Sequence, residues 1–289
     1  MDLSGLDYLA AAGAAAVAGA INALAGGGTL VSFPALVAIG VPAVSANVTN
    51  TVSLVPGYLS GTWAQRDDLR PQMARGRPLL VAAALGGIGG SLLLVSIPSH
   101  AFRVAVPYLI LASCGLLLFQ DRIRDWLRPP GADRAGSPDP ADTADPSSGQ
   151  AANRRAVDAE AVNPEAANAQ AAHWRTALLV SVFASAVYGG FFGAGLGIML
   201  LAVLGLFSAE PLVKLNALKQ ALSFVVNLAA AIFFVFSGKV VWELVPVMAA
   251  ASIIGGVTGG RLVQVIDATL LRGLVVAMGV AVAIAFWVA

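Results

Sequence analysis

Residues 22–36 read NALAGGGTLVSFPAL, and a second copy of this pattern follows 169 positions later, where residues 191–205 read FFGAGLGIMLLAVLG. The same shift carries residues 19–119 onto 188–288 without a gap. The matched residues include glycine, proline, asparagine and arginine: Gly26 with Gly195, Gly28 with Gly197, Pro42 with Pro211, Asn47 with Asn216, Gly86 with Gly255, and Arg103 with Arg272. A register that keeps so many residue types is a repeat rather than a chance match of Gly-rich and Ala-rich stretches. An internal repeat in an apolar chain is typical of secondary transporters.

The composition indicates an integral membrane protein. Hydrophobic residues make up 58% of the chain and charged residues 11%, with a mean hydropathy of +0.80, whereas soluble domains carry about 25% charged residues. Much of the charge lies at 65–77 and 120–175, which leaves long uncharged stretches between. A net charge of +1 without a basic patch speaks against nucleic acid as a partner. One cysteine and two distant histidines give neither a disulfide nor a metal cluster, so no cofactor is expected.

Apolar segments recur in the same order in both copies. They cover 6–25, 29–41, 43–64, 78–97 and 101–119, and then 176–193, 198–208, 211–237, 244–265 and 269–288. The segments that follow the glycines, 29–41 and 198–208, are too short to cross about 30 Å of hydrocarbon at 1.5 Å per residue. Whether they cross or re-enter stays open.

The predicted fold is therefore an all-α integral membrane protein with two repeats of about five helical segments each, broken or shortened after the glycine motifs. The first repeat covers 1–120 and the second 175–289. Between them, 121–174 is rich in Ala, Asp, Pro and Asn and nearly lacks branched apolar residues. Such a stretch buries too little surface to offset its ordering entropy, so we predict a disordered linker.

The arginines predict the orientation. Four of them lie at 65–77, and Arg122, Arg124 and Arg128 open the linker. Both regions should be cytoplasmic by the positive-inside rule, which puts both termini outside. Each half then crosses an odd number of times, and the halves form an inverted-topology repeat about a pseudo-two-fold axis in the membrane plane. The competing arrangement has four crossings in each half and parallel repeats.

Helices are interrupted at Gly26-Gly27-Gly28 and at Gly195-Leu196-Gly197, and these two glycine breaks predict the substrate site. Broken helices expose backbone N–H groups and positive helix ends, which favour an anion, and glycine allows both a sharp turn and a close approach. Thr29 follows the first break and should cap the short helix after it. The predicted donors are Gly26, Gly27, Gly28, Thr29, Gly195 and Gly197. The alternative is that these glycines only let helices pack closely.

A polar face follows each break. Residues at spacings of three, four and seven share one face of a helix. In the first copy this face carries Asn47, Asn50, Thr51 and Tyr58, and in the second it carries Asn216, Lys219, Gln220, Ser223 and Asn227. Since lipid offers no hydrogen bonds, these faces should point inward. We expect the binding site to be completed by Asn47, Asn50, Thr51, Asn216, Lys219, Gln220 and Ser223. Interhelical hydrogen bonding is the alternative, above all for the matched pair Asn47 and Asn216.

Lys219 is the most specific of these candidates, because it is a charged residue within an apolar segment. A lysine inside the membrane costs about 2.5–3.5 kcal/mol on insertion scales, and such residues usually line a pathway. A fixed positive charge in a cavity attracts an anion. The alternative is that Lys219 lies near the cytoplasmic end and reaches the lipid headgroups, as Lys214 should.

The glycine runs resemble those of the TauE/SafE family of sulfite exporters. The run Asn22-Ala-Leu-Ala-Gly26-Gly-Gly28-Thr-Leu-Val-Ser-Phe-Pro34, followed by Gly40-Val-Pro42 and Ala46-Asn47, is similar to the first family signature, and Gly189-Gly190-Phe-Phe-Gly193-Ala-Gly195-Leu-Gly197 is similar to the second. The resemblance covers both membrane halves and leaves out the linker. It implies export of small sulfur-containing anions, such as sulfite or organosulfonates, through a bacterial inner membrane. The second copy departs from the family pattern, because Leu196 replaces a glycine and no proline follows it.

Two other functions stay open: an anion channel, and a membrane scaffold without transport. An enzyme is not expected, because the apolar segments hold neither a nucleophile–base set nor a metal cluster. The exact anion, the direction of transport, the coupling ion and the oligomeric state, a homodimer included, are not determined by the sequence.

Overall fold

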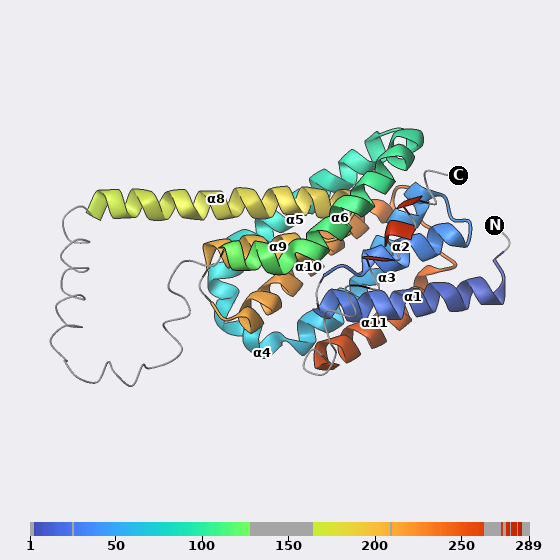
Figure 1. Cartoon of the computed structure of the whole chain (residues 1–289), viewed down its shortest axis with the longest axis horizontal. Coiled ribbons are helices and arrows are strands. Elements are labelled where there is room, and N and C mark those ends of the chain that lie inside the picture. The colour runs from blue at the N-terminus through green and yellow to red at the C-terminus, as the bar shows by residue number, and fades with distance from the viewer. Residues whose placement is uncertain are drawn as a thin grey trace.

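The computed structural model describes residues 3–24, 26–127, 164–208 and 210–262, and single positions between 273 and 284. In this part of the chain all regular structure is helical, which confirms the predicted class (Figure 1). The helices are α1 (Gly5–Leu24), α2 (Thr29–Ala38), α3 (Ala43–Ala64), α4 (Arg66–Leu69), the 3-10 helix η1 (Arg70–Gln72), α5 (Met73–Ser96), α6 (Ser99–Leu127), α8 (Pro164–Phe191), α9 (Leu196–Phe207), α10 (Leu212–Val235) and α11 (Val245–Leu262). Three of them are long and apolar enough to cross a membrane, within Gly5–Ala23, Gly76–Ser96 and Leu212–Val235, as an integral membrane protein requires.

Short helices follow both glycine motifs, as predicted. α2 has 10 residues and α9 has 12. Gly26 lies between α1 and α2 with a φ of 90°, and Gly195 precedes α9 with a φ of 77°. Side chains with a Cβ avoid this left-handed region, so glycine is what permits the chain to turn here.

Helix extends into both ends of the segment expected to be a linker. α6 continues to Leu127, and α8 begins at Pro164 rather than near 176. Proline suits the first position of a helix, and the Ala-rich stretch after it has high helix propensity. The remainder of the expected linker, 128–163, and most of the expected last segment, 269–288, lie outside the described residues.

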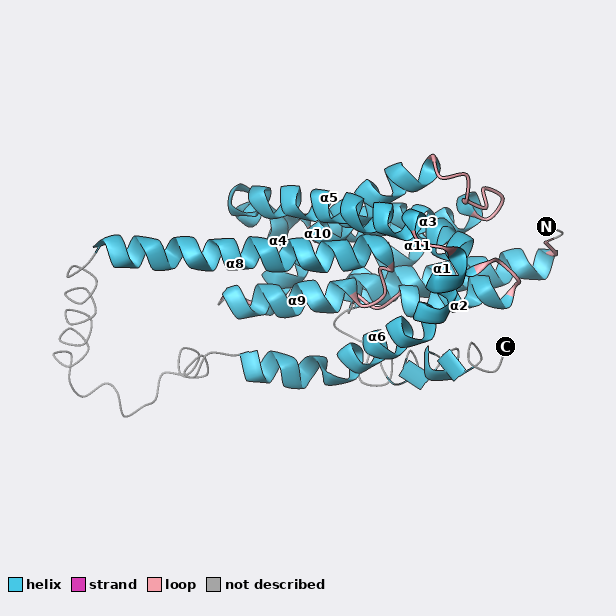
Figure 2. Cartoon of the chain, turned by 90° about the horizontal axis from the view of Figure 1, so that it is seen from above, coloured by secondary structure: helices cyan, strands magenta, loops and turns pink. Residues whose placement is uncertain are grey.

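The pairs of contacting helices recur when the two halves are exchanged. α1 packs along α11 and α8 along α5, while α3 contacts α11 and α10 contacts α5. A shift of 169 positions exchanges α1 with α8, α3 with α10 and α5 with α11. α3 and α10 also contact each other. Figure 2 shows several of the loops at the end of the bundle where α1 begins.

Glycines let these paired helices approach closely. A Cβ on Gly19 of α1 would lie 2.5 Å from the carbonyl oxygen of Ser252 in α11, and one on Gly86 of α5 would lie 2.6 Å from Cβ of Ala186 in α8. Both distances are far below van der Waals contact. These helical glycines therefore act as small contact residues between membrane helices.

Candidate functional site

The structure brings the two glycine breaks into contact. A Cβ on Gly26 would lie 2.5 Å from Cα of Gly197, and one on Gly197 would lie 2.5 Å from Cα of Gly26. Phe33 in α2 and Phe192 after α8 pack edge to face beside this contact, with ring centroids 5.4 Å apart. The N–H of Gly26 itself donates to the carbonyl of Ile21 at 2.9 Å. The breaks are thus one structural unit made from both halves of the chain.

The start of α2 is capped from α1, and the predicted cap by Thr29 is wrong. The N-cap residue is Gly28, and no side-chain hydrogen bond caps the helix from that position or from the buried Thr29. Instead Asn22 in the last turn of α1 accepts a hydrogen bond from the Gly28 N–H through Oδ1, at 2.7 Å. The first backbone bond of α2 runs from Leu30 to the carbonyl of Gly27, at 3.0 Å. The N–H group that the sequence assigned to Thr29 is therefore satisfied by a side chain from the preceding helix.

Lys219 lies at the same break and is fully buried. Its exposed fraction is 0%, and its Nζ donates to the carbonyl oxygen of Asn22 at 3.3 Å. The last carbonyls of a helix carry the negative end of the helix dipole, which favours a cation there. Lys214, by contrast, is 40% exposed and pairs with Glu210 at 3.0 Å. Within the described part of the chain Lys219 has no carboxylate partner, and its burial does not fit the alternative of a side chain that reaches the headgroups.

Buried polar atoms without a hydrogen-bond partner gather on α3 and α10. Among the described residues these atoms are Asn47 Oδ1, Asn50 Oδ1, Ser53 Oγ, Gln220 Nε2, Gln220 Oε1 and Ser223 Oγ. Leaving such a group unpaired costs about 1–3 kcal/mol, and native proteins contain few of them. Gly61 of α3 leaves room for the Gln220 amide, because a Cβ there would lie 2.5 Å from Gln220 Nε2. These atoms are therefore available to hydrogen-bond with a polar ligand.

The matched asparagines tie the polar helices to the breaks. Asn47 donates through Nδ2 to the carbonyl of Phe191 at 3.0 Å. Asn216 donates through Nδ2 to the carbonyl of Ala23 at 3.4 Å and to Oε1 of Gln65 at 2.7 Å. Phe191 ends α8 and Ala23 lies next to the end of α1, so each asparagine holds the end of the helix that precedes a break. These contacts are the interhelical hydrogen bonds of the alternative interpretation.

The remaining predicted residues lie in or next to this region. Thr51 is buried and donates to the carbonyl of Asn47 in its own helix, at 2.9 Å. Gly195 is the N-cap of α9 and packs against Ser113 of α6, whose Cβ would lie 3.5 Å from a Cβ on the glycine. The Ser113 hydroxyl donates to the carbonyl of Ala194 at 3.1 Å and lies 2.8 Å from the Tyr188 hydroxyl.

Three residues of the site were missed by sequence reasoning: Asn22, Ser53 and Ser113. Asn22 is an isolated amide in an apolar segment, and Ser53 follows Asn50 by three positions on the same helix face. Both signals were available in the sequence. Nothing in the pattern around Ser113 indicates its role, because its contacts outside its own helix, with Tyr188 and Ala194, come from the other half.

Comparison with known proteins supplies an independent view. A family model described as sulfite exporter TauE/SafE matches residues 11–286. A Haemophilus influenzae protein named "Probable membrane transporter protein" is 31% identical over 266 residues, which is 91% of this chain and 87% of the relative. "Probable membrane transporter protein ORF9" of a Sinorhizobium species is 25% identical over 94% of this chain and 88% of its own length. "Probable membrane transporter protein YfcA" of Escherichia coli K12 is 22% identical over 91% of this chain and 82% of its own length. No solved structure gives a significant match.

Proposed function

The chain belongs to the TauE/SafE sulfite exporter family, and from this premise we propose that it exports small sulfur-containing anions, such as sulfite or organosulfonates, across a bacterial inner membrane. The family and the names of the relatives indicate a membrane transporter rather than an enzyme. The kind of anion, the outward direction and the choice of membrane belong to the proposal.

The observation that carries the proposal is the set of unpartnered polar atoms beside Lys219. Sulfite presents oxygen acceptors, and the Lys219 ammonium, Gln220 Nε2 and Ser223 Oγ are donors from adjacent positions on one face of α10. Asn50 Oδ1 on α3 is an acceptor and suits the proton of a hydrogensulfite ion or a bridging water. A positive charge with several neutral donors is the chemistry that binds an oxyanion.

Burial of this cluster favours alternating access over an open channel. Lys219, Gln220 and Ser223 are 0%, 0% and 1% exposed. An ion therefore reaches them only when helices move apart, and we propose that the contact between Gly26 and Gly197 is one of the places that opens. Rocking of one repeat against the other supplies such a movement.

The helix contacts support the arrangement of the two repeats as an inverted pair. Exchanging the halves carries the α1–α11 contact onto α8–α5 and the α3–α11 contact onto α10–α5, as a pseudo-two-fold axis requires. In Figure 1, α1 begins at one end of the molecule and α8 begins at the other. We propose that the end with α4 and the start of α8 is cytoplasmic, in line with the arginines of 65–77.

Sulfite transport by two lysine variants in proteoliposomes tests the proposal. Lys219→Gln removes the buried charge but keeps a group that can donate to Asn22, and Lys214→Gln removes an exposed charge from the same helix. Loss of one charge-assisted hydrogen bond is worth a factor of about ten to one hundred. We expect that loss of sulfite flux for Lys219→Gln and near wild-type flux for Lys214→Gln, with flux that saturates at high sulfite.

Three outcomes would contradict the proposal. Equal flux in both variants would remove the anion role of Lys219. Flux that rises without saturation would favour the anion channel, and absence of flux in the wild-type protein with every sulfur anion tried would favour the scaffold.

A further inference from the structure

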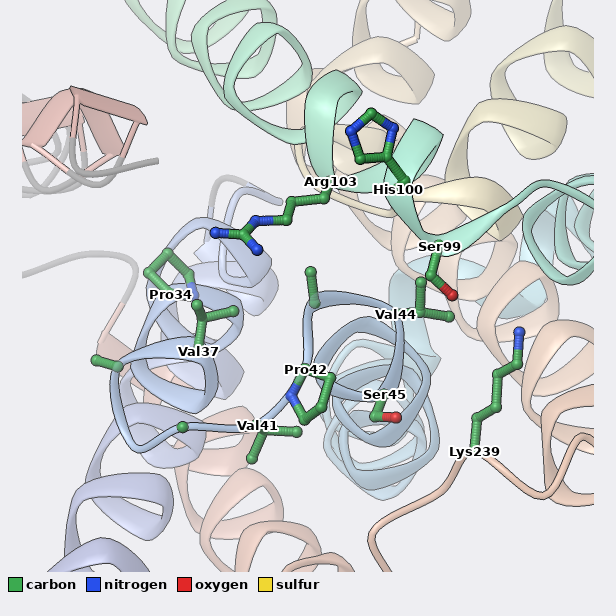
Figure 3. A pocket seen from close by; sticks show the side chains of 13 residues that line it. Pro34, Val37, Val41, Pro42, Val44, Ser45, Ser99, His100, Arg103 and Lys239 are labelled. Atoms are coloured by element: carbon green, nitrogen blue, oxygen red, sulfur yellow. The ribbon is translucent and has the colours of Figure 1, made fainter. Parts of the chain in front are cut away.

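A cavity lies apart from the buried polar cluster on α3 and α10. This pocket has a volume of about 680 Å³ and is lined by the last turn of α2, the α2–α3 connection, the first turns of α3 and α6, and the connection after α10 (Figure 3). None of its lining residues belongs to the predicted substrate site. Figure 1 shows these connections at the end of the molecule where α1 begins.

Basic side chains enter this pocket from two different parts of the chain. Arg103 comes from the start of α6, and Lys239 comes from the connection between α10 and α11. The ring of His100 points away from both in Figure 3. The described residues that line the pocket include no carboxylate, and no ion pair found in the described part of the chain involves Arg103 or Lys239. Figure 3 shows Arg103 on the side of Pro34 and Lys239 on the side of Val44. The two charges thus face the cavity from opposite walls.

The wall between these charges is apolar. It consists of Pro34, Val37, Ala38, Val41, Pro42 and Val44. Ser45 and Ser99 add two hydroxyl groups at its edge (Figure 3). An inorganic oxyanion would pair with the charges and leave this wall unfilled, whereas an anion with a short hydrocarbon part would cover it and gain hydrophobic stabilisation.

The repeat shows that the other end of the molecule is built differently. A shift of 169 positions carries Arg103 onto Arg272 and Lys239 onto Arg70, so cationic residues occupy both sets of positions. The same shift carries Val41 onto Glu210, which places a carboxylate where the first copy has an apolar wall. In the sequence, the combination of cations with an apolar residue at this wall position therefore occurs in the first copy and not in the second.

We propose that this pocket binds a soluble amphipathic anion, an oxyanion head such as a sulfonate on a short alkyl chain. The head lies between Arg103 and Lys239, and the chain lies against Val41, Pro42 and Val44. Soluble anions and lipid headgroups both reach helix ends and connections; we assign this pocket to a soluble anion, and the nanodisc experiment below tests that choice. Lys239 comes from the second repeat and the other lining residues come from the first, so a bound anion bridges the two repeats. Binding at this pocket does not depend on the proposed transport function. Only a role of the pocket in the transport path would rest on that proposed function.

Calorimetric titration of the purified full chain in non-ionic detergent tests the proposal, with butanesulfonate and sulfate as probes. We expect butanesulfonate to bind more tightly than sulfate, and Arg103→Gln and Lys239→Gln each to weaken it by roughly tenfold. Arg77→Gln is the matched control, since it removes an exposed arginine that does not line the pocket. Wild-type affinity in both pocket variants, or equal affinity for the two probes, would overturn the proposal.

Two further arms distinguish this pocket from the buried cluster and from a lipid site. If Lys219→Gln loses butanesulfonate binding while the pocket variants keep it, the anion sits in the buried cluster and the pocket proposal is wrong, although the proposed function stands. In nanodiscs of phosphatidylcholine, addition of phosphatidylglycerol should leave butanesulfonate binding unchanged. Loss of binding on that addition would assign the pocket to a lipid headgroup and overturn the choice of a soluble anion.

Discussion

Replacing Ser223 with alanine should stabilise the protein and weaken its anion binding at the same time. The Ser223 hydroxyl is 1% exposed and has no hydrogen-bond partner, and such a group costs about 1–3 kcal/mol. Alanine removes it and leaves a gap smaller than a methyl group, worth less than about 1 kcal/mol. The expected net gain is about 1 kcal/mol, or a rise of about 2–4 °C in melting temperature.

Ser252→Ala is the matched control for this prediction. Ser252 is 0% exposed, and its one hydroxyl proton is shared between the carbonyl of Ala249 at 2.8 Å and that of Ser53 at 3.1 Å. Its removal should cost about 1 kcal/mol because the Ser53 carbonyl loses a partner. Both changes replace a helical serine with alanine, so the difference in helix propensity cancels between them.

Thermal unfolding of the purified variants, with and without sulfite, measures both effects. Sulfite should raise the melting temperature of the wild-type protein by mass action, and should raise that of Ser223→Ala by less. If Ser223→Ala unfolds at as low a temperature as Ser252→Ala, the hydroxyl has a structural partner and the reasoning from burial fails. If its sulfite-induced shift equals that of the wild type, Ser223 does not contact the anion.

Two further predictions concern the breaks and the topology. Gly26→Ala places a Cβ at a φ of 90° and 2.5 Å from Cα of Gly197, so it should destabilise the protein by at least about 1–2 kcal/mol. Gly205→Ala is the control and should not destabilise the protein, because no atom lies near its Cβ position. Equal melting temperatures of the two variants would contradict this prediction. In a cysteine-free background, Arg70→Cys and Lys239→Cys occupy equivalent positions of the repeat and should react with a membrane-impermeant thiol reagent from opposite sides of the membrane, while labelling from one side would establish parallel repeats.

The helices and their breaks could be predicted from the sequence because local signals mark them. The predicted segment 43–64 coincides with α3, and 211–237 differs from α10 by one or two residues at each end. Pro42 and Pro211 are the N-cap residues of these helices. Proline is well tolerated at the start of a helix, because the N–H groups there have no partner within the helix and proline lacks this group.

The partners across the site could not be predicted in the same way. The shift pairs Gly26 with Gly195, but in the structure Gly26 contacts Gly197. Helical spacing shows that Asn50 and Ser53 share a face, yet it says nothing of which helix lies opposite. The Thr29 cap failed for the same reason, because the group that satisfies Gly28 comes from Asn22, six residues back across a turn.

Asn22 takes part in two contacts at the joint between α1 and α2. Its side chain holds the first turn of α2, and its backbone carbonyl receives the ammonium group of Lys219. An anion that draws the ammonium group toward itself weakens its hold on the last turn of α1, and a change in the turn between α1 and α2 displaces the oxygen that the lysine contacts. If Lys219 binds the anion as proposed, anion binding and the geometry of this turn are energetically coupled, and the coupling is reciprocal. In the proposed function, an anion that binds at Lys219 would therefore act first on the joint between α1 and α2.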